Sequence, residues 1–165
     1  MKTLFKSTFL FALLTLATQQ LSAQITSDTV RYDDGSMVIG KGYLNGIING
    51  YGVMVWATGE KYEGEWKANE QNGPGTMRWA NGDVFTGEWK KNVRVGSGKM
   101  TWASGDIYEG EWKNDVQDGK GKMKWAEGDY YEGEFKNNMV HGEGTMKYAT
   151  GVVYSGKWKN NEFLK

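Results

Sequence analysis

Residues 62–84 read YEGEWKANEQNGPGTMRWANGDV, and the same pattern returns every 23 residues in the segments 85–107, 108–130 and 131–153. Every tryptophan falls on one of two positions of this period. The first position holds Trp66, Trp89, Trp112 and Trp158, and the second holds Trp56, Trp79, Trp102 and Trp125. A period this regular indicates an array of identical small units. A catalytic site is unique within a chain, so an array argues against most enzymatic functions.

Less regular units flank these four segments. A degenerate unit covers residues 38–61, with Gly42 as a single inserted residue, and a shorter unit, YSGKWKNNEFLK, covers 154–165. The fragment YDDGS at 32–36 is similar to the tail of a still earlier unit. We therefore predict a repeat array over residues 38–165, as five units and a half unit, after a lead-in at 24–37 that holds a partial repeat.

Within each unit the residue pattern alternates with a period of two, which predicts β-strands. Tyr108, Gly110 and Trp112 share one face, and Glu109 and Glu111 lie on the other. Glycines between large rings leave room in which a neighbouring ring can lie flat. We expect opposite charges to pair across the strands of the other face.

Two kinds of connection are expected between the strands. A glycine in each ATGE-like or ANGD-like segment predicts a tight turn with a positive φ angle. These are Gly59, Gly82, Gly105, Gly128 and Gly151. A loop of six to eight residues, such as KNDVQDG at 113–119, is expected at the other end of each hairpin. The predicted fold is all-β, a single twisted antiparallel meander sheet that curls into an elongated trough with its aromatic face inside.

The first 23 residues have the layout of a secretory signal peptide. Lys2 and Lys6 precede an apolar run over residues 9–17, and small residues precede a cleavage site before Gln24. The run is too short for a membrane-spanning helix, and a buried N-terminal helix is the alternative. Segment 1–23 therefore predicts export to the periplasm, the outer envelope or the medium.

Charge and cysteine content narrow the classes of partner. The chain has 20 basic and 20 acidic side chains, and loss of Lys2 and Lys6 with the signal peptide would leave a net charge of about −2. This charge argues against nucleic acid as a partner and gives little attraction to an anionic membrane. The chain has no cysteine, so stability must come from packing rather than from disulfides.

The motif Y-E-G-E-W-K-N, followed by G-x-G-x-M-x-W-A-x-G-D, resembles the MORN repeat (membrane occupation and recognition nexus) over residues 38–165. The resemblance implies a repeat scaffold, and the family name implies lipid association. Tyr51, Val53 and Val55 depart from it, since they lie where other units carry charges. Choline- and glucan-binding repeats also alternate glycine with aromatic residues, but their unit is shorter.

Residues that are able to support catalysis are few, and most of them repeat. His141 is the one histidine, and we expect it in a hairpin loop, so neither a histidine-based triad nor a His- or Cys-rich metal site is expected. Ser97, between two glycines, is expected at a strand start. The carboxylate pairs, such as Glu109 and Glu111, recur on a solvated face. The turn residues Asp83, Asp106 and Asp129 are expected to stabilise turns rather than bind calcium. We expect no enzyme, metal or cofactor.

Two surfaces remain as candidate binding sites, although most of the rings are expected to be structural. The aromatic face comprises Tyr62, Trp66, Trp79, Phe85, Trp89, Trp102, Tyr108, Trp112, Trp125 and Tyr131. The open strand edge of the half unit comprises Tyr154, Trp158 and Phe163. We predict a non-catalytic scaffold for protein–protein contact, through a protein partner or self-association at this C-terminal edge. The alternatives are weak lipid contact at a membrane surface and glycan or peptide binding along the aromatic face.

Overall fold

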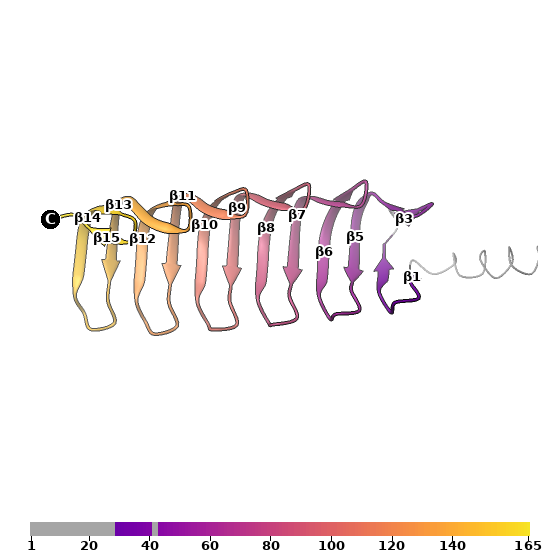
Figure 1. The fold of residues 1–165 in the computed structure, drawn as a ribbon, viewed down its shortest axis with the longest axis horizontal. Helices are drawn as coiled ribbons and strands as arrows, with labels where there is room; N and C mark the ends of the chain where they lie inside the picture. The colour runs from indigo at the N-terminus through magenta and orange to yellow at the C-terminus, as the bar shows by residue number, and fades with distance from the viewer. Residues whose placement is uncertain (1–28, 41–42) are drawn as a thin grey trace, which may run out of the picture.

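The computed structural model describes residues 29–40 and 43–165, and these form a long ribbon of β-strands (Figure 1). One antiparallel sheet of 13 strands runs through these residues in the order β1-β2-β5-β6 and onward to β15, and β3 and β4 form a separate two-stranded sheet. Each strand in the array pairs with its neighbours in sequence, which confirms the predicted all-β meander of tandem hairpins. The predicted signal peptide at 1–23 and the inserted Gly42 lie outside the described residues.

From β6 to β13 the strands fall into regular pairs of seven and nine residues. The N-terminal strands are β1 (Thr29–Arg31), β2 (Met37–Ile39), β3 (Tyr43–Leu44), β4 (Ile47–Ile48) and β5 (Gly50–Val55). The regular array comprises β6 (Lys61–Lys67), β7 (Glu70–Arg78), β8 (Val84–Lys90), β9 (Val93–Thr101), β10 (Ile107–Lys113), β11 (Val116–Lys124), β12 (Tyr130–Lys136) and β13 (Met139–Lys147). The last two strands are β14 (Val153–Lys159) and β15 (Glu162–Phe163).

Of the two turns in each unit, one agrees with the prediction and the other does not. The glycine turns form as expected: Gly105 has a φ of 95° and its N–H donates to the Trp102 carbonyl. The predicted loop of six to eight residues is wrong. Asn114 and Asp115 form a two-residue turn with φ values of 50° and 66°, and β11 has already begun at Val116. Asparagine and aspartate tolerate this left-handed conformation, so the hairpin closes without a longer loop.

Two other residues that were predicted in a loop or at a strand start lie inside strands, because the two-residue turns let the following strands begin earlier. His141 lies inside β13 rather than in a loop, and Ser97 lies inside β9 rather than at its start. Both positions follow a two-residue turn by several residues. Both residues therefore pair with the neighbouring strands.

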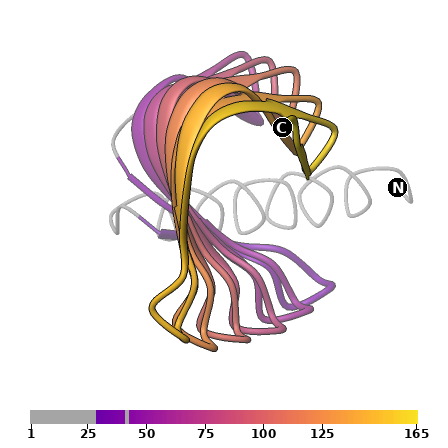
Figure 2. The same ribbon diagram turned by 90° about the vertical axis from the view of Figure 1, so that its left-hand side faces the viewer.

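Viewed along the ribbon, the strands superimpose and curl into a hook (Figure 2). The two-residue turns lie at the tip of the hook (Figures 1 and 2). The glycine turns, which have five residues, as between β7 and β8, lie at its flared end. Tyr62 and Trp66 are four residues apart on one face of β6, yet their ring centroids are 4.8 Å apart. A straight strand would advance about 13 Å over four residues. The strand therefore bends toward this face, and the rings lie on the concave side.

Glycine pairs at the bend make this packing sterically possible. Gly110 on β10 lies directly opposite Gly121 on β11, beneath the ring of Tyr108. A Cβ atom on Gly121 would lie 2.6 Å from both Cε2 and the hydroxyl oxygen of Tyr108. The same arrangement recurs at Gly64–Gly75, Gly87–Gly98 and Gly133–Gly144. The predicted space for a ring beside the strand glycines is confirmed.

Side chains at both ends of the hairpins tie each unit to the next. At the hook tip, Asn92 Oδ1 accepts the Gln71 N–H at 2.8 Å, and the Asn92 N–H donates to the Gln71 carbonyl at 3.0 Å. At the flared end, Asp83 Oδ1 accepts the Ala103 N–H at 2.8 Å. Asp106 and Asp129 make the same bond to Ala126 and Ala149. The turn aspartates therefore join neighbouring units as well as shape their own turns.

The Gly121→Ala substitution tests the requirement for glycine at the bend. The added methyl group collides with the Tyr108 ring, so the free energy of unfolding should fall by about 1–3 kcal/mol, as for other overpacked cores. Gly52→Ala is the matched control, because the same position in the first unit offers ordinary contacts at 3.5 Å. Urea denaturation followed by tryptophan fluorescence measures both. Equal losses in the two variants would contradict the steric account.

Candidate functional site

The rings at the first tryptophan position, together with the Tyr or Phe ring four residues before each, form one continuous row inside the hook. Successive rings meet edge to face, with centroids 4.8–5.8 Å apart and planes inclined by 83–90°. The order along the ribbon is Trp66, Tyr62, Trp89, Phe85, Trp112, Tyr108, Phe135, Tyr131 and Trp158. Each contact between units joins a Tyr or Phe to the Trp or Phe of the next hairpin.

These rings are buried, so they form the core of the hook. Tyr62, Phe85, Tyr108 and Tyr131 are 0% exposed, and Trp66, Trp89, Trp112 and Trp158 are 4–6% exposed. The indole N–H of Trp112 donates to the Gly98 carbonyl at 3.1 Å. Trp66, Trp89 and Trp158 make the equivalent bond. Every polar group that a tryptophan brings into this core is therefore hydrogen-bonded.

The buried tyrosines remain neutral donors. Burial raises the pKa of Tyr131 to about 12, and its hydroxyl group donates to the Glu134 carbonyl at 3.1 Å. Burial also raises the pKa of Tyr62 and of Tyr108. These hydroxyl groups act as hydrogen-bond donors within the hook, not as general bases near neutral pH.

The second tryptophan position lies toward the flared end and is only partly buried. Trp56, Trp79, Trp102 and Trp125 pack against the buried core, as does Tyr148. Of the predicted aromatic face, Trp79, Trp102 and Trp125 thus keep part of their surface in solvent. The remaining predicted residues lie in the closed interior, where they cannot contact a ligand without unfolding the hook.

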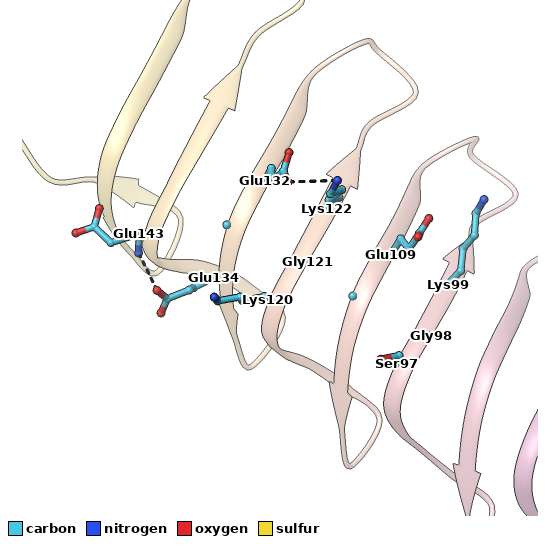
Figure 3. A pocket seen from close by; sticks show the side chains of 12 residues that line it. Ser97, Gly98, Lys99, Glu109, Lys120, Gly121, Lys122, Glu132, Glu134 and Glu143 are labelled. Atoms are coloured by element: carbon cyan, nitrogen blue, oxygen red, sulfur yellow. Dashed lines mark hydrogen bonds and ion pairs between the residues drawn. The ribbon is translucent and has the colours of Figure 1, made fainter.

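The opposite face of the sheet carries charges in a shallow groove of about 770 Å³ (Figure 3). Lys99, Lys120 and Lys122 and the carboxylates Glu109, Glu132, Glu134 and Glu143 line it. The Lys122 ammonium group lies 3.2 Å from Glu132, as the predicted cross-strand pairing of charges requires, although both side chains are more than half exposed. Exposed pairs of this kind contribute little stability. The balanced signs favour neither an anionic nor a cationic ligand.

The recurring carboxylate pairs have a structural role on this face. Glu111 Oε1 accepts the backbone N–H of Lys120 at 3.2 Å, beside the left-handed Gly119 in a β-bulge. Glu134 Oε1 approaches the Glu143 N–H in the same way, at 3.5 Å. The bulge interrupts the pairing of the two strands at this point, and the carboxylate supplies an acceptor for the N–H group.

His141 and the acidic residues do not assemble into a metal centre. His141 lies opposite Glu134, and its buried Nδ1 atom has no hydrogen-bond partner in the described part of the chain. Residues 29–40 and 43–165 contain no group of three or more His, Cys, Asp or Glu side chains arranged to hold a metal ion. In the same ranges no helix is long and apolar enough to cross a membrane.

The outer edge of β14 differs from every equivalent edge in the array. Tyr154 occupies the position of the fully buried Tyr131 but is 43% exposed, and Val153 beside it is 54% exposed. The sequence predicted no second strand here, whereas the structure forms a short one, β15, opposite Trp158 and Lys159. The Phe163 ring packs on Trp158 and Tyr154 at 5.1 and 5.2 Å. The edge predicted from Tyr154, Trp158 and Phe163 is thus covered at Trp158 and exposed at Tyr154.

A family model for the MORN repeat matches five segments of this chain: 42–61, 62–84, 85–107, 108–130 and 131–153. Together they cover more than half of the sequence, in the register derived from the tryptophan spacing. This chain belongs to the MORN-repeat family. No curated protein is found to match it.

The MORN array is similar to solved structures. One such structure is the SAS-4 (dCPAP) TCP domain of Drosophila melanogaster, in complex with a proline-rich motif of Ana2 (dSTIL). The match covers 79% of this chain and 83% of that one, at 13% identity and a TM-score of 0.36. A likeness at this level carries no argument about function.

Two residues that pair with one another, Arg94 and Asp115, differ from the residues at the same positions in the other MORN units, and the sequence pattern did not predict their contact. Arg94 stands where Gln71, Gln117 and Val140 stand in other units, and Asp115 stands where the next turn has asparagine elsewhere. The Arg94 guanidinium lies 4.6 Å from the centre of the Trp112 ring, and its Nε atom lies 2.8 Å from Asp115 Oδ1. A comparison of aligned units reveals the pair, because both residues depart together.

The Arg94–Asp115 pair should show energetic coupling in a double-mutant cycle. Arg94→Gln and Asp115→Asn each install the residue that other units carry, so the Asn side chain still accepts the residue 94 N–H. We expect a coupling free energy of about 1 kcal/mol between the two side chains, because the Arg94 side chain is only 19% exposed. High salt should reduce this coupling. Denaturation midpoints of the wild type, both single variants and the double variant measure it. Strictly additive losses would contradict the pairing.

Proposed function

We propose that this chain is an exported, non-catalytic MORN scaffold that mediates protein–protein contact, with the outer edge of β14 as its docking site. The observation that carries the proposal is the exposure of Tyr154, 43% against 0% for the four equivalent rings. A sheet edge with an uncovered aromatic residue favours pairing with a strand from another chain. Export rests on the predicted signal peptide at 1–23.

The remaining surfaces support a scaffold rather than a catalyst. On the charged face, Glu132 pairs with Lys122, and Glu111 and Glu134 accept backbone N–H groups at bulges. The aromatic side chains with the greatest stacking potential are buried in the hook. Repetition gives the ribbon long, regular surfaces on which a partner can be held in a fixed orientation.

Several apolar side chains at this edge are exposed, which suits a protein partner. Val152, Val153 and Tyr154 are 46%, 54% and 43% exposed, and Leu164 nearby is 47% exposed. The equivalent turn position in the preceding units holds an aspartate that binds the next unit, and here it is Val152. A partner that covers these side chains would remove apolar area from water at about 25 cal/mol per Å².

Affinity capture of the tagged chain from its native envelope or medium tests this proposal. Tyr154→Glu places a charge in the docking site and should abolish capture of the partner. Tyr51→Glu is the matched control, because Tyr51 is 62% exposed at the far end of the ribbon and should not affect capture. Unchanged tryptophan fluorescence would show that both variants fold. Equal capture by the Tyr154→Glu variant and the wild type would refute the proposed docking site.

A further inference from the structure

The charged face of the sheet is striped across its middle, because acidic and basic strands alternate there. β10 and β12 are acidic in this region, whereas β9 and β11 are basic. The exposed side chains that form the stripes are Lys99 on β9, Glu109 and Glu111 on β10, Lys120 and Lys122 on β11, and Glu132 and Glu134 on β12. Figure 3 shows them on neighbouring strands of the ribbon. A partner that matches these stripes must carry charges in the opposite order.

The central row of this face is self-complementary. It runs Thr76, Thr86, Lys99, Glu109, Lys122, Glu132, Thr145 and Ser155, each the cross-strand neighbour of the next. Four charges of alternating sign thus lie between two pairs of hydroxyl side chains. Read from the other end, the row exchanges every lysine for a glutamate and returns a hydroxyl group to each hydroxyl position. A second copy of the same row, in reverse order, therefore supplies the matching charges.

Contacts within the chain leave part of the central row unpaired. Lys122 lies 3.2 Å from Glu132. Lys99 and Glu109 are exposed and form no ion pair within residues 29–40 and 43–165. Backbone glycines such as Gly110 line the groove beside the row, so the long charged side chains stand above its floor. Their tips are the first groups that a facing surface meets.

A two-fold axis parallel to the strands, placed between β10 and β11, brings opposite charges together. It turns two copies face to face and reverses the strand order of the second copy, while each row stays opposite itself. Glu109 then faces Lys122 of the second copy, and Lys99 faces Glu132 of the second copy. Because a two-fold interface is isologous, each contact occurs twice. The central rows therefore form four ion pairs, and their hydroxyl groups face one another at both ends.

Other face-to-face arrangements bring like charges together or lose ion pairs. An axis along the ribbon leaves the strand order unchanged, so each acidic strand lies on itself. An axis through β10 sets Lys99 against Lys122 of the second copy. An axis between β9 and β10 keeps only the contact between Lys99 and Glu109 and its symmetry mate. Like charges directly opposite one another oppose association, so the stripes select the axis between β10 and β11.

The neighbouring row, one step nearer the hook tip, agrees with this axis. Glu111 of one copy faces Lys120 of the other. Glu88 and Glu143 are the one pair of like charges that the axis brings together in this row. Lys157 is the cross-strand neighbour of Glu143, so a positive charge lies beside that approach. The two rows together hold six pairs of opposite charge and two of like charge.

We propose that two copies of this chain bind back to back through the charged face, with a two-fold axis between β10 and β11. The inference goes beyond the proposed docking edge of β14, because it uses another surface and identifies the partner as a second copy of the chain. The balanced signs of this face, which suit neither an anionic nor a cationic ligand, suit a copy of itself. Exposed charged tips make the contact, so the association is weak and sensitive to salt.

Analytical ultracentrifugation of the full chain over a series of concentrations measures this association. We expect a monomer–dimer equilibrium at an ionic strength of about 0.01 M, where the Debye length is about 30 Å, and monomers at about 1 M. Lys99→Glu and Glu132→Lys each replace two attractive contacts of the dimer with two repulsive ones. Each variant should therefore raise the dissociation constant about tenfold or more at low salt.

The double variant Lys99→Glu/Glu132→Lys separates the dimer contact from effects within one chain. In the dimer the two changed residues face each other, so the dissociation constant should return to within about threefold of the wild-type value. Within the chain the swap does the reverse, because it sets like charges opposite one another at positions 99 and 109 and at positions 122 and 132. An equimolar mixture of the two single variants should also form the dimer that neither forms alone.

Three results would overturn the inference: a wild type that stays monomeric at low salt, a double variant as dissociated as the single variants, or loss of the dimer in Tyr154→Glu. The last change lies at the β14 edge and should leave the dimer intact. Failure of the charged interface and failure of the docking edge are thus told apart. Unchanged tryptophan fluorescence shows that each variant folds.

Discussion

The contact between an aromatic ring and a pair of facing glycines sets the shape of the whole ribbon. A single sheet has no second layer to cover it, so it must bury its apolar face by bending over itself. The bend brings Tyr108 and Trp112 together from positions four residues apart on one strand, and Gly110 and Gly121 leave space for the ring. Each edge-to-face contact contributes about 0.5–1.5 kcal/mol beyond area burial. Because each Tyr or Phe also meets a ring of the following unit, the bend and the stacking of units depend on the same contact.

This constraint decides which surfaces remain for function. A ring that supports the bend is enclosed by it, so the concave face cannot also be an open trough at the first tryptophan position. The charged face stays accessible, but Glu132 is paired with Lys122, and Glu111 and Glu134 accept N–H groups at bulges. At the edge of β14 the equivalent ring, Tyr154, is 43% exposed. There the element that stabilises the array elsewhere becomes exposed, and this exposure makes Tyr154 the centre of the proposed docking site.

Much of this arrangement could be predicted from the sequence, because the repeat samples the same positions many times. Alternation of Tyr108, Gly110 and Trp112 gives the strands and their buried face directly. The turn lengths were mispredicted, since KNDV contains no glycine and the left-handed Asn114–Asp115 pair has the composition of a loop. The sequence predicts that the sheet curls, but it does not predict the sharp bend at Gly110, because a period of two determines only the face on which each side chain lies. Whether a ring is covered depends on a neighbouring strand, so the contrast between Tyr131 and Tyr154 required the structure.

Tryptophans at the first position lie in the closed core, and those at the second position are partly open to solvent. Hydrogen exchange of the indole N–H groups, followed by NMR, tests it most directly. The account predicts strong protection for Trp66, Trp89, Trp112 and Trp158, whose N–H groups donate to glycine carbonyls inside the hook. The indoles at the second position, Trp56, Trp79, Trp102 and Trp125, should exchange faster. Exchange at the same rate at both positions would show that the hook is open and would contradict the account.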